Sequence, residues 1–251
     1  MKRVICCTAL CLCAVGAAPA AEPEVEVTLA AASRYVWRGL AAENDRPVFD
    51  PSVSVAWRGF NASVWALFPA ESFTEADGGW DHSETDYTLS YSRELGGAEL
   101  TGGVVYYTLP ASGGFTHEAF VEAALPDLPL APTLGLYRDL GDCGSLYASV
   151  AVSHEVEIAA VPGLSLCLGA GLGWGDRRYV KDAFGLNRAA LCDIDVSASV
   201  GYALSDAAEV SVTVRHSWFV DDSVRDAVSD PAAGYGDAAP VVASVSVAAR
   251  F

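Results

Sequence analysis

Charged side chains recur at alternate positions in stretches of this sequence that are otherwise apolar. In the block SRYVWRGL, residues 33–40, Arg34 and Arg38 stand four residues apart among aromatic and aliphatic neighbours. Alternate residues of a β-strand share one face. Such charges could therefore face a common water-filled interior, where opposed guanidinium and carboxylate groups would filter charged solutes. The alternative is that these groups only neutralise one another and fill a narrow interior. The predicted interior, pore-lining residues are Arg34, Arg38, Arg58, Asp193, Asp195, Glu209, Arg215 and Arg250.

Two acidic segments could offer oxygen ligands to a metal ion. Residues 71–86 carry six carboxylates and no Lys or Arg, and residues 221–237 carry five carboxylates against Arg225. Such segments suit Ca²⁺ or Mg²⁺, but neither has the ligand spacing of an EF-hand. The sequence therefore favours a solvated acidic rim that concentrates cations over a specific metal site, and we expect no metal or other cofactor. The predicted rim consists of Glu71, Glu75, Asp77, Asp81, Glu84, Asp221, Asp222 and Asp226.

A third kind of chemistry would be hydrolysis. The tripeptide Asp81-His82-Ser83 places a histidine beside an aspartate, an arrangement that can activate water or a serine hydroxyl. The other histidines, His117, His154 and His216, have no obvious Ser or Asp partner in the pattern of the chain. We therefore expect no enzymatic activity.

The first twenty residues have the organisation of a signal peptide. Lys2 and Arg3 precede an apolar run, and Ala18-Pro19-Ala20 offers small residues at the spacing that a signal peptidase requires. We predict that residues 1–20 direct export through the general secretory pathway and that residues 21–251 form a single domain.

Composition restricts the remaining possibilities. The chain is 52% hydrophobic with a mean hydropathy of +0.28, yet beyond the leader no run approaches the roughly 18 apolar residues that a membrane helix requires. With 15 Lys and Arg against 32 Asp and Glu, the net charge of −17 excludes nucleic acid as a partner. Three of the seven cysteines, Cys143, Cys167 and Cys192, lie beyond the leader. They are predicted to be small, mostly buried apolar residues.

A period of two dominates the hydrophobic pattern. At the C-terminus, apolar residues at every odd position from Val241 to Phe251 alternate with a second, partly polar set. Residues 190–202 place Cys192 with the aliphatic side chains on one face and the carboxylates at positions 193 and 195 on the other. Twelve strands are predicted, at residues 25–38, 48–58, 60–68, 85–94, 98–108, 115–125, 131–138, 144–158, 163–174, 189–204, 208–219 and 240–251.

The length and the sense of this alternation distinguish a membrane barrel from a soluble sandwich or a lipocalin-like barrel. Strands of about ten residues with one aliphatic face and one Gly, Ser or charged face fit lipid outside and water inside, and short turns alternate with longer links. Aromatic residues also gather near the predicted strand ends, as interfacial girdles do. We predict an all-β fold, a transmembrane antiparallel up-and-down β-barrel of about 12 strands with short periplasmic turns and longer extracellular loops. Arg34 and Arg38 would lie in strand 25–38 and point into the lumen.

The N-terminal block also resembles a known family. The segments ASRYVWRGLAAENDRPVFDPSVSVAW and ASVWA, followed by ETDYTLSYSRELGG and GVVYYTLP, resemble in their order the TorF-type family of outer-membrane porins. The resemblance covers residues 30–110 and extends to the rest of the chain in strand rhythm. It implies a pore-forming protein of the bacterial outer membrane. We expect a narrow passive channel for small hydrophilic, charged solutes.

The expected partners follow from that location. They are outer-membrane lipid and lipopolysaccharide, small hydrophilic solutes, and the barrel-assembly machinery, because terminal Phe251 on an alternating strand is similar to the recognition signal of that machinery. We expect a monomer or a weak oligomer. A barrel that does not conduct and serves a structural or surface-binding role is the alternative.

Overall fold

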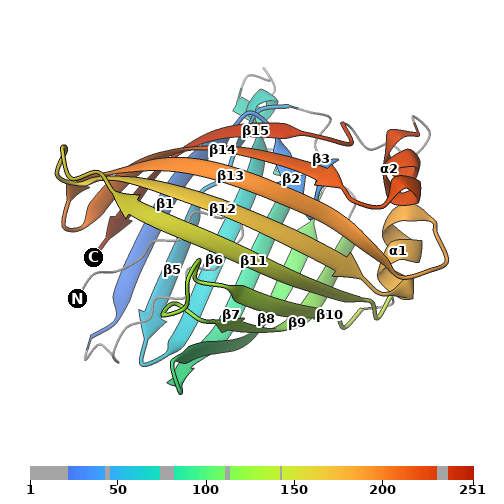
Figure 1. The fold of residues 1–251 in the computed structure, drawn as a ribbon, viewed down its shortest axis with the longest axis horizontal. Coiled ribbons are helices and arrows are strands. Elements are labelled where there is room, and N and C mark those ends of the chain that lie inside the picture. Colours follow the sequence, from blue (N-terminus) through green and yellow to red (C-terminus); the bar gives the residue numbers. More distant parts are fainter. Residues whose placement is uncertain (1–21, 43–45, 74–81, 111–113, 142, 231–236) are drawn as a thin grey trace.

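Antiparallel strands form a closed barrel in the computed structural model of the chain (Figure 1). The structure describes residues 22–42, 46–73, 82–110, 114–141, 143–230 and 237–251. The wall strands pair antiparallel with their neighbours all the way round, and the last pairs with the first, from Glu26 opposite Arg250 to Ala32 opposite Ser244. The wall strands are β1 (Glu24–Ala32), β4 (Val48–Phe49), β5 (Ser52–Trp57), β6 (Phe60–Pro69), β7 (Glu84–Leu95), β8 (Ala98–Leu109), β9 (Gly114–Ala124), β10 (Thr133–Asp139), β11 (Leu146–Glu157), β12 (Leu164–Gly175), β13 (Ala190–Ser205), β14 (Ala208–Phe219) and β15 (Val241–Arg250).

The short strands β4 and β5 together occupy one position in the wall. Both pair with β1 on one side and with β6 on the other. Pro51 separates them, because a proline cannot donate to the ladder. Counted in this way the barrel has twelve wall strands, so the predicted fold and strand number are confirmed.

The side chains alternate between an apolar outer face and a small or polar inner face. On β13, Val196 and Val200 are 42% and 47% exposed on the outside, while Ser199 between them is 2% exposed and faces inward. Inner hydroxyls of neighbouring strands bond to one another, as Thr213 does when it donates to Ser199 at 2.9 Å. Because the barrel is closed by the β1–β15 pairing, lipid meets apolar side chains and no unpaired backbone edge.

The first strand ends earlier than its sequence pattern indicates. The wall strand stops at Ala32, and the chain then turns into a hairpin made of β2 (Tyr35–Trp37) and β3 (Leu40–Ala42), which form a separate two-stranded sheet. A two-residue turn with positive φ at Arg38 (46°) and Gly39 (80°) connects them, the geometry that the twist of a tight hairpin favours. The prediction that Arg34 and Arg38 belong to the first wall strand is therefore wrong. Its cause is physical: a hairpin strand shows the same period of two as a wall strand.

Two short helices lie at one end of the barrel. They are α1 (Arg177–Phe184), between β12 and β13, and α2 (Asp222–Ser229), between β14 and β15. We call this the helix end, and the opposite end, where β1 begins and β15 ends, the turn end (Figure 1). A one-turn 3-10 helix, η2 (Ala70–Phe73), follows β6. Within the described ranges, the helices are all too short and too polar to cross a membrane.

The largest buried cluster lies at the helix end and includes residues of both helices, the hairpin and the wall. Its members are Leu40, Tyr147, Tyr179, Val180, Phe184, Ala190, Cys192, Phe219, Val224 and Val228. Cys192 belongs to it because the β12–β13 register shifts between Leu172 and Trp174. Such a bulge turns the side chain to the other face. The expectation that Cys192 shares the outer face is thus wrong, although its burial and that of Cys167 agree with the prediction for the cysteines.

Candidate functional site

The hairpin formed by residues 33–42, which we call the lumen hairpin, contacts the barrel wall from inside. The Tyr35 ring lies 5.7 Å from the Trp65 ring on β6. On the opposite side, Arg215 of β14 donates to the Val36 carbonyl at 2.9 Å, and Val36 packs with Val242 of β15. The root of the lumen hairpin is therefore held by three separate wall strands.

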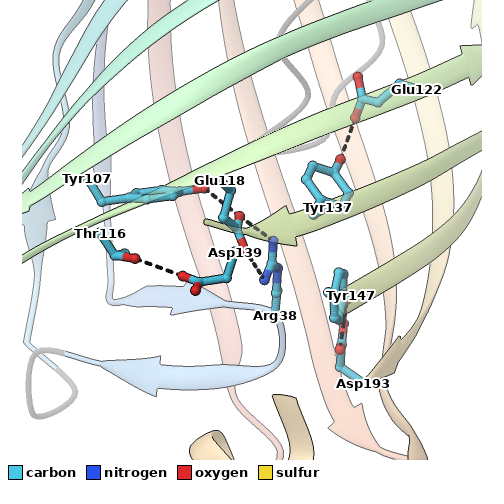
Figure 2. A network of polar contacts seen from close by, with 9 residues as sticks. All are labelled: Arg38, Tyr107, Thr116, Glu118, Glu122, Tyr137, Asp139, Tyr147 and Asp193. Atoms are coloured by element: carbon cyan, nitrogen blue, oxygen red, sulfur yellow. Dashed lines mark hydrogen bonds and ion pairs between the residues drawn. The ribbon is translucent and has the colours of Figure 1, made fainter. Parts of the chain in front are cut away.

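The tip of the lumen hairpin is held by a buried ion pair. Arg38 donates from both terminal nitrogens to the two carboxylate oxygens of Glu118 on β9, at 3.0 and 2.8 Å, and the two side chains are only 9% and 7% exposed. Figure 2 shows the Tyr107 hydroxyl beside them, which donates to Glu118 at 3.0 Å. A bidentate pair of this kind fixes direction as well as distance.

Four aromatic rings surround the same guanidinium group. Its central carbon lies 4.1 Å from the Tyr147 ring centre and 4.4 Å from that of Trp37, with Tyr137 and Tyr179 at 5.1 and 5.7 Å. A cation over aromatic faces gains more when it is desolvated, as it is here. The rings come from β10, β11, α1 and the hairpin itself. Arg38 therefore connects the tip of the hairpin to two wall strands and to α1 at the helix end.

Close packing at the turn completes the anchoring. A Cβ added at Gly39 would lie 2.7 Å from Cβ of Asp193 and 3.1 Å from the Phe219 ring, so only glycine fits against β13 and β14. The lumen hairpin thus contacts β6, β14 and β15 near its root and β9 and β13 at its tip. It crosses the lumen and narrows it at the helix end.

Further polar contacts line the inner face around this crossing (Figure 2). The Thr116 hydroxyl donates to Asp139 at 2.8 Å, Tyr147 donates to Asp193 at 2.9 Å, and Tyr137 donates to Glu122. The carboxylates in these contacts are bonded to neutral hydroxyl groups and not to cations. Along the described inner face from β9 to β13, acidic side chains therefore outnumber basic ones.

The arginines predicted to line the pore lie in different parts of the structure. Arg38 is inside the barrel, but on the lumen hairpin. Arg34 lies in the bend after β1, 3.6 Å from the Asp237 carboxylate. The prediction that Arg58 belongs to an inner strand face is wrong. Arg58 occupies the β5–β6 turn with a φ of 51° and lies over the Trp57 ring, and this two-residue turn interrupts the alternation. Arg215 and Arg250 are on inner faces, and Arg250 donates to Glu26 at 2.7 Å.

The predicted carboxylates Asp193, Asp195 and Glu209 also lie on the inner face. Asp193 is buried at the helix end, whereas Glu209 lies near the turn end, opposite Ala203. Asp195 faces the space that a side chain on Gly171 would fill. That these residues line a conducting pore stays a prediction.

The acidic rim is only partly described. Glu75, Asp77 and Asp81 lie outside the described residues, and Glu84 belongs to wall strand β7. Glu71 pairs with Arg46, and Asp222 pairs with Arg225 at 2.6 Å. Asp226 is exposed on α2.

Asp221 has a structural role at the start of α2. Its carboxylate accepts from the backbone nitrogens of Ser223 and Val224, at 2.9 and 3.2 Å, and also pairs with Arg188. The hydrogen bond from Arg188 holds the pKa of this carboxyl below its usual value. Asp221 therefore caps a helix and is not simply a solvated rim charge.

The sequence interpretation missed the partners of Arg38. Glu118 and Glu122 share one parity in strand 115–125, so the alternation already placed both on the inner face. Glu118 pairs with Arg38 of the hairpin and Glu122 with Tyr137 of β10, and neither pairing had a sequence signal. The imidazole of His82 lies 5.9 Å from the Phe68 ring. In the part of the chain that the structure describes, no three His, Cys, Asp or Glu side chains are grouped to hold a metal ion.

The closed barrel, apolar outside and polar inside, defines an outer-membrane type of fold. Solved structures with the same fold include the NanC porin (TM-score 0.59, 10% identity, 89% of this chain and 98% of that one) and the KdgM porin (0.56, 9%, 90% and 99%). A third is the COG4313 outer membrane channel from Pseudomonas putida F1 (0.51, 10%, 94% and 98%). No protein-family model and no curated protein matches the sequence. At these identities the likeness establishes the fold.

Proposed function

We propose that this protein is an outer-membrane porin, a narrow passive channel for small hydrophilic solutes. The observation that carries the proposal is the inner face between the lumen hairpin and the turn end. It is lined by small and polar side chains, some of which hydrogen-bond to one another across neighbouring strands. These include Ser54, Ser63, Ser90, Thr101, Gly103, Ser197, Ser199, Ser211, Thr213 and Ser246.

The lumen hairpin would form the constriction of this channel. A twelve-stranded barrel is intermediate between side-chain-filled eight-stranded barrels and wide porins of 16 to 18 strands. A segment that crosses such a lumen sets the size of solute that passes. The short-turn end is then periplasmic and the helix end extracellular, as in other outer-membrane barrels.

The location and the partners belong to the same proposal. The leader at residues 1–20 would direct export through the general secretory pathway, and Phe251 would serve the barrel-assembly machinery. Lipid and lipopolysaccharide would cover the outer face. The order of motifs in residues 30–110 supports membership of the TorF-type family. The proposal includes no enzymatic step.

A second candidate is a barrel that does not conduct. It is favoured by one observation, the apolar cluster that includes Leu40, Tyr179 and Phe184 inside the helix end. If this cluster and the lumen hairpin close the whole cross-section, the protein would have a structural or surface-binding role.

Conductance distinguishes the two candidates. The protein is refolded in detergent, its folding is checked by heat-dependent electrophoretic mobility, and it is added to a planar bilayer in KCl. Discrete, uniform conductance steps support the channel. A barrel that is folded by this criterion and never produces steps would overturn the porin proposal in favour of the closed barrel.

A further inference from the structure

The charges on the inner face are strongly unbalanced. Arg215 and Arg250 are the inward arginines that the described wall strands provide, and the lumen hairpin adds Arg34 and Arg38. Arg38 is fully engaged by the two oxygens of Glu118, and Arg250 by Glu26. Carboxylates outside these pairs therefore determine the sign of the net charge in the lumen.

Several inner carboxylates have only neutral hydrogen-bond donors. Glu122 accepts from Tyr137, Asp139 accepts from Thr116 and from the Gly144 backbone, and Asp193 accepts from Tyr147. A neutral donor stabilises a carboxylate without cancelling its charge. Asp139 and Asp193 lie near the helix end on β10 and β13, whereas Glu122 lies nearer the turn end of β9, so their fields add along the lumen.

A separate observation indicates what occupies this region. Asp86 on β7 is 8% exposed and faces inward between Trp65 and Tyr107, yet its Oδ1 atom is buried without a hydrogen-bond partner among the described residues. Its charged neighbours are the carboxylates of Glu84 and Glu118. A buried acceptor without a donor is costly, and a cation or its hydration water would satisfy it.

We propose that the lumen selects small cations, with Asp86 and the inner carboxylates around the lumen hairpin as the selective element. This inference rests on the proposed channel function and names its substrate class: inorganic monovalent cations and small organic ammonium ions. Arg38 and Arg250 are tied to carboxylates, and Arg215 donates to the Val36 carbonyl, so these arginines do not form an anion path.

The test is the reversal potential across a KCl gradient at pH 9, where Asp86 is ionised, recorded on the refolded wild-type protein and on Asp86→Asn. The wild type is expected to pass K⁺ in preference to Cl⁻. Asp86→Asn should lower the K⁺ to Cl⁻ permeability ratio at least about twofold, because the removed charge lies within a Debye length of any ion at the constriction. Asp127→Asn, in the exposed turn after β9, removes the same charge away from the lumen and should leave the ratio unchanged.

A second variant makes the test independent of how Asp86→Asn folds. Glu122→Gln removes an inner charge on another strand and is expected to lower the ratio in the same direction. A conducting wild type that prefers Cl⁻, or a ratio that neither variant changes, would overturn cation selection while leaving the channel function intact. A folded wild type without conductance would overturn both.

Discussion

Replacing Arg38 with methionine tests whether the lumen hairpin is held by its ion pair. The substitution keeps most of the side-chain volume but leaves Glu118 buried and without its cation. Removal of one partner from a buried pair costs about 3–5 kcal/mol, and loss of the cation over four aromatic rings adds to this. Either the barrel loses this free energy of unfolding, or the lumen hairpin leaves its position and the constriction widens.

Two measurements distinguish these outcomes. Urea unfolding of the refolded protein in lipid vesicles gives the change in free energy, and single-channel recording gives the change in conductance. The double variant Arg38→Met with Glu118→Gln also removes the carboxylate that the single variant leaves unpaired. A double-mutant cycle with the two single variants should give a coupling free energy between Arg38 and Glu118 of about 2–3 kcal/mol.

The matched control is Arg225→Met. Arg225 pairs with Asp222 at 2.6 Å, but both side chains are largely exposed. An exposed pair contributes about 0–1 kcal/mol. If Arg38→Met changed stability by no more than Arg225→Met and left the conductance unchanged, the claim that the Arg38–Glu118 ion pair holds the lumen hairpin would be refuted.

Three further predictions concern the turn, the cap and the thiols. Gly39→Ala should destabilise the lumen hairpin by about 1–3 kcal/mol, because it combines a φ of 80° with a clash at 2.7 Å, and open-channel noise should rise. Since the pKa of Asp221 is lowered in the folded state, its contribution is present above its unfolded pKa, near 4, and is lost as the pH falls through the folded value. Hydrogen exchange of α2 should accelerate in that acid range, and Arg188→Gln should shift the onset to higher pH. A maleimide should label Cys143 in the folded protein but not the fully buried Cys192; equal labelling would contradict the bulge.

The barrel could be predicted from the sequence because its hydrophobic pattern, with a period of two residues, has a physical cause. A wall between lipid and water requires alternate apolar and polar residues, so the strand ranges and the inward position of residues such as Asp193 and Glu209 follow directly. The same rule failed where the backbone leaves the wall. Arg58 lies in a turn, and Cys192 changes face at a bulge, and neither event alters the alternation enough to be seen in advance.

The lumen hairpin could not be predicted for a related reason. Tyr35 and Trp37 continue the parity of β1, so the pattern alone does not distinguish a longer wall strand from a segment folded inside. Gly39 alone is a weak signal for a turn in the sequence, and the positive φ of Arg38 is seen only in the structure. The partner of Arg38 depends on how the closed barrel brings β9 to the tip of this hairpin, which is a property of the tertiary structure.

The most direct test of the account is the conductance of two refolded proteins: the wild type, and a variant in which residues 34–41 are replaced by two glycines. The account predicts small, uniform, cation-selective steps for the wild type and larger steps for the variant, because the lumen hairpin sets the constriction. If both proteins fold into heat-modifiable barrels and neither conducts, the lumen is not a channel and the central claim is wrong.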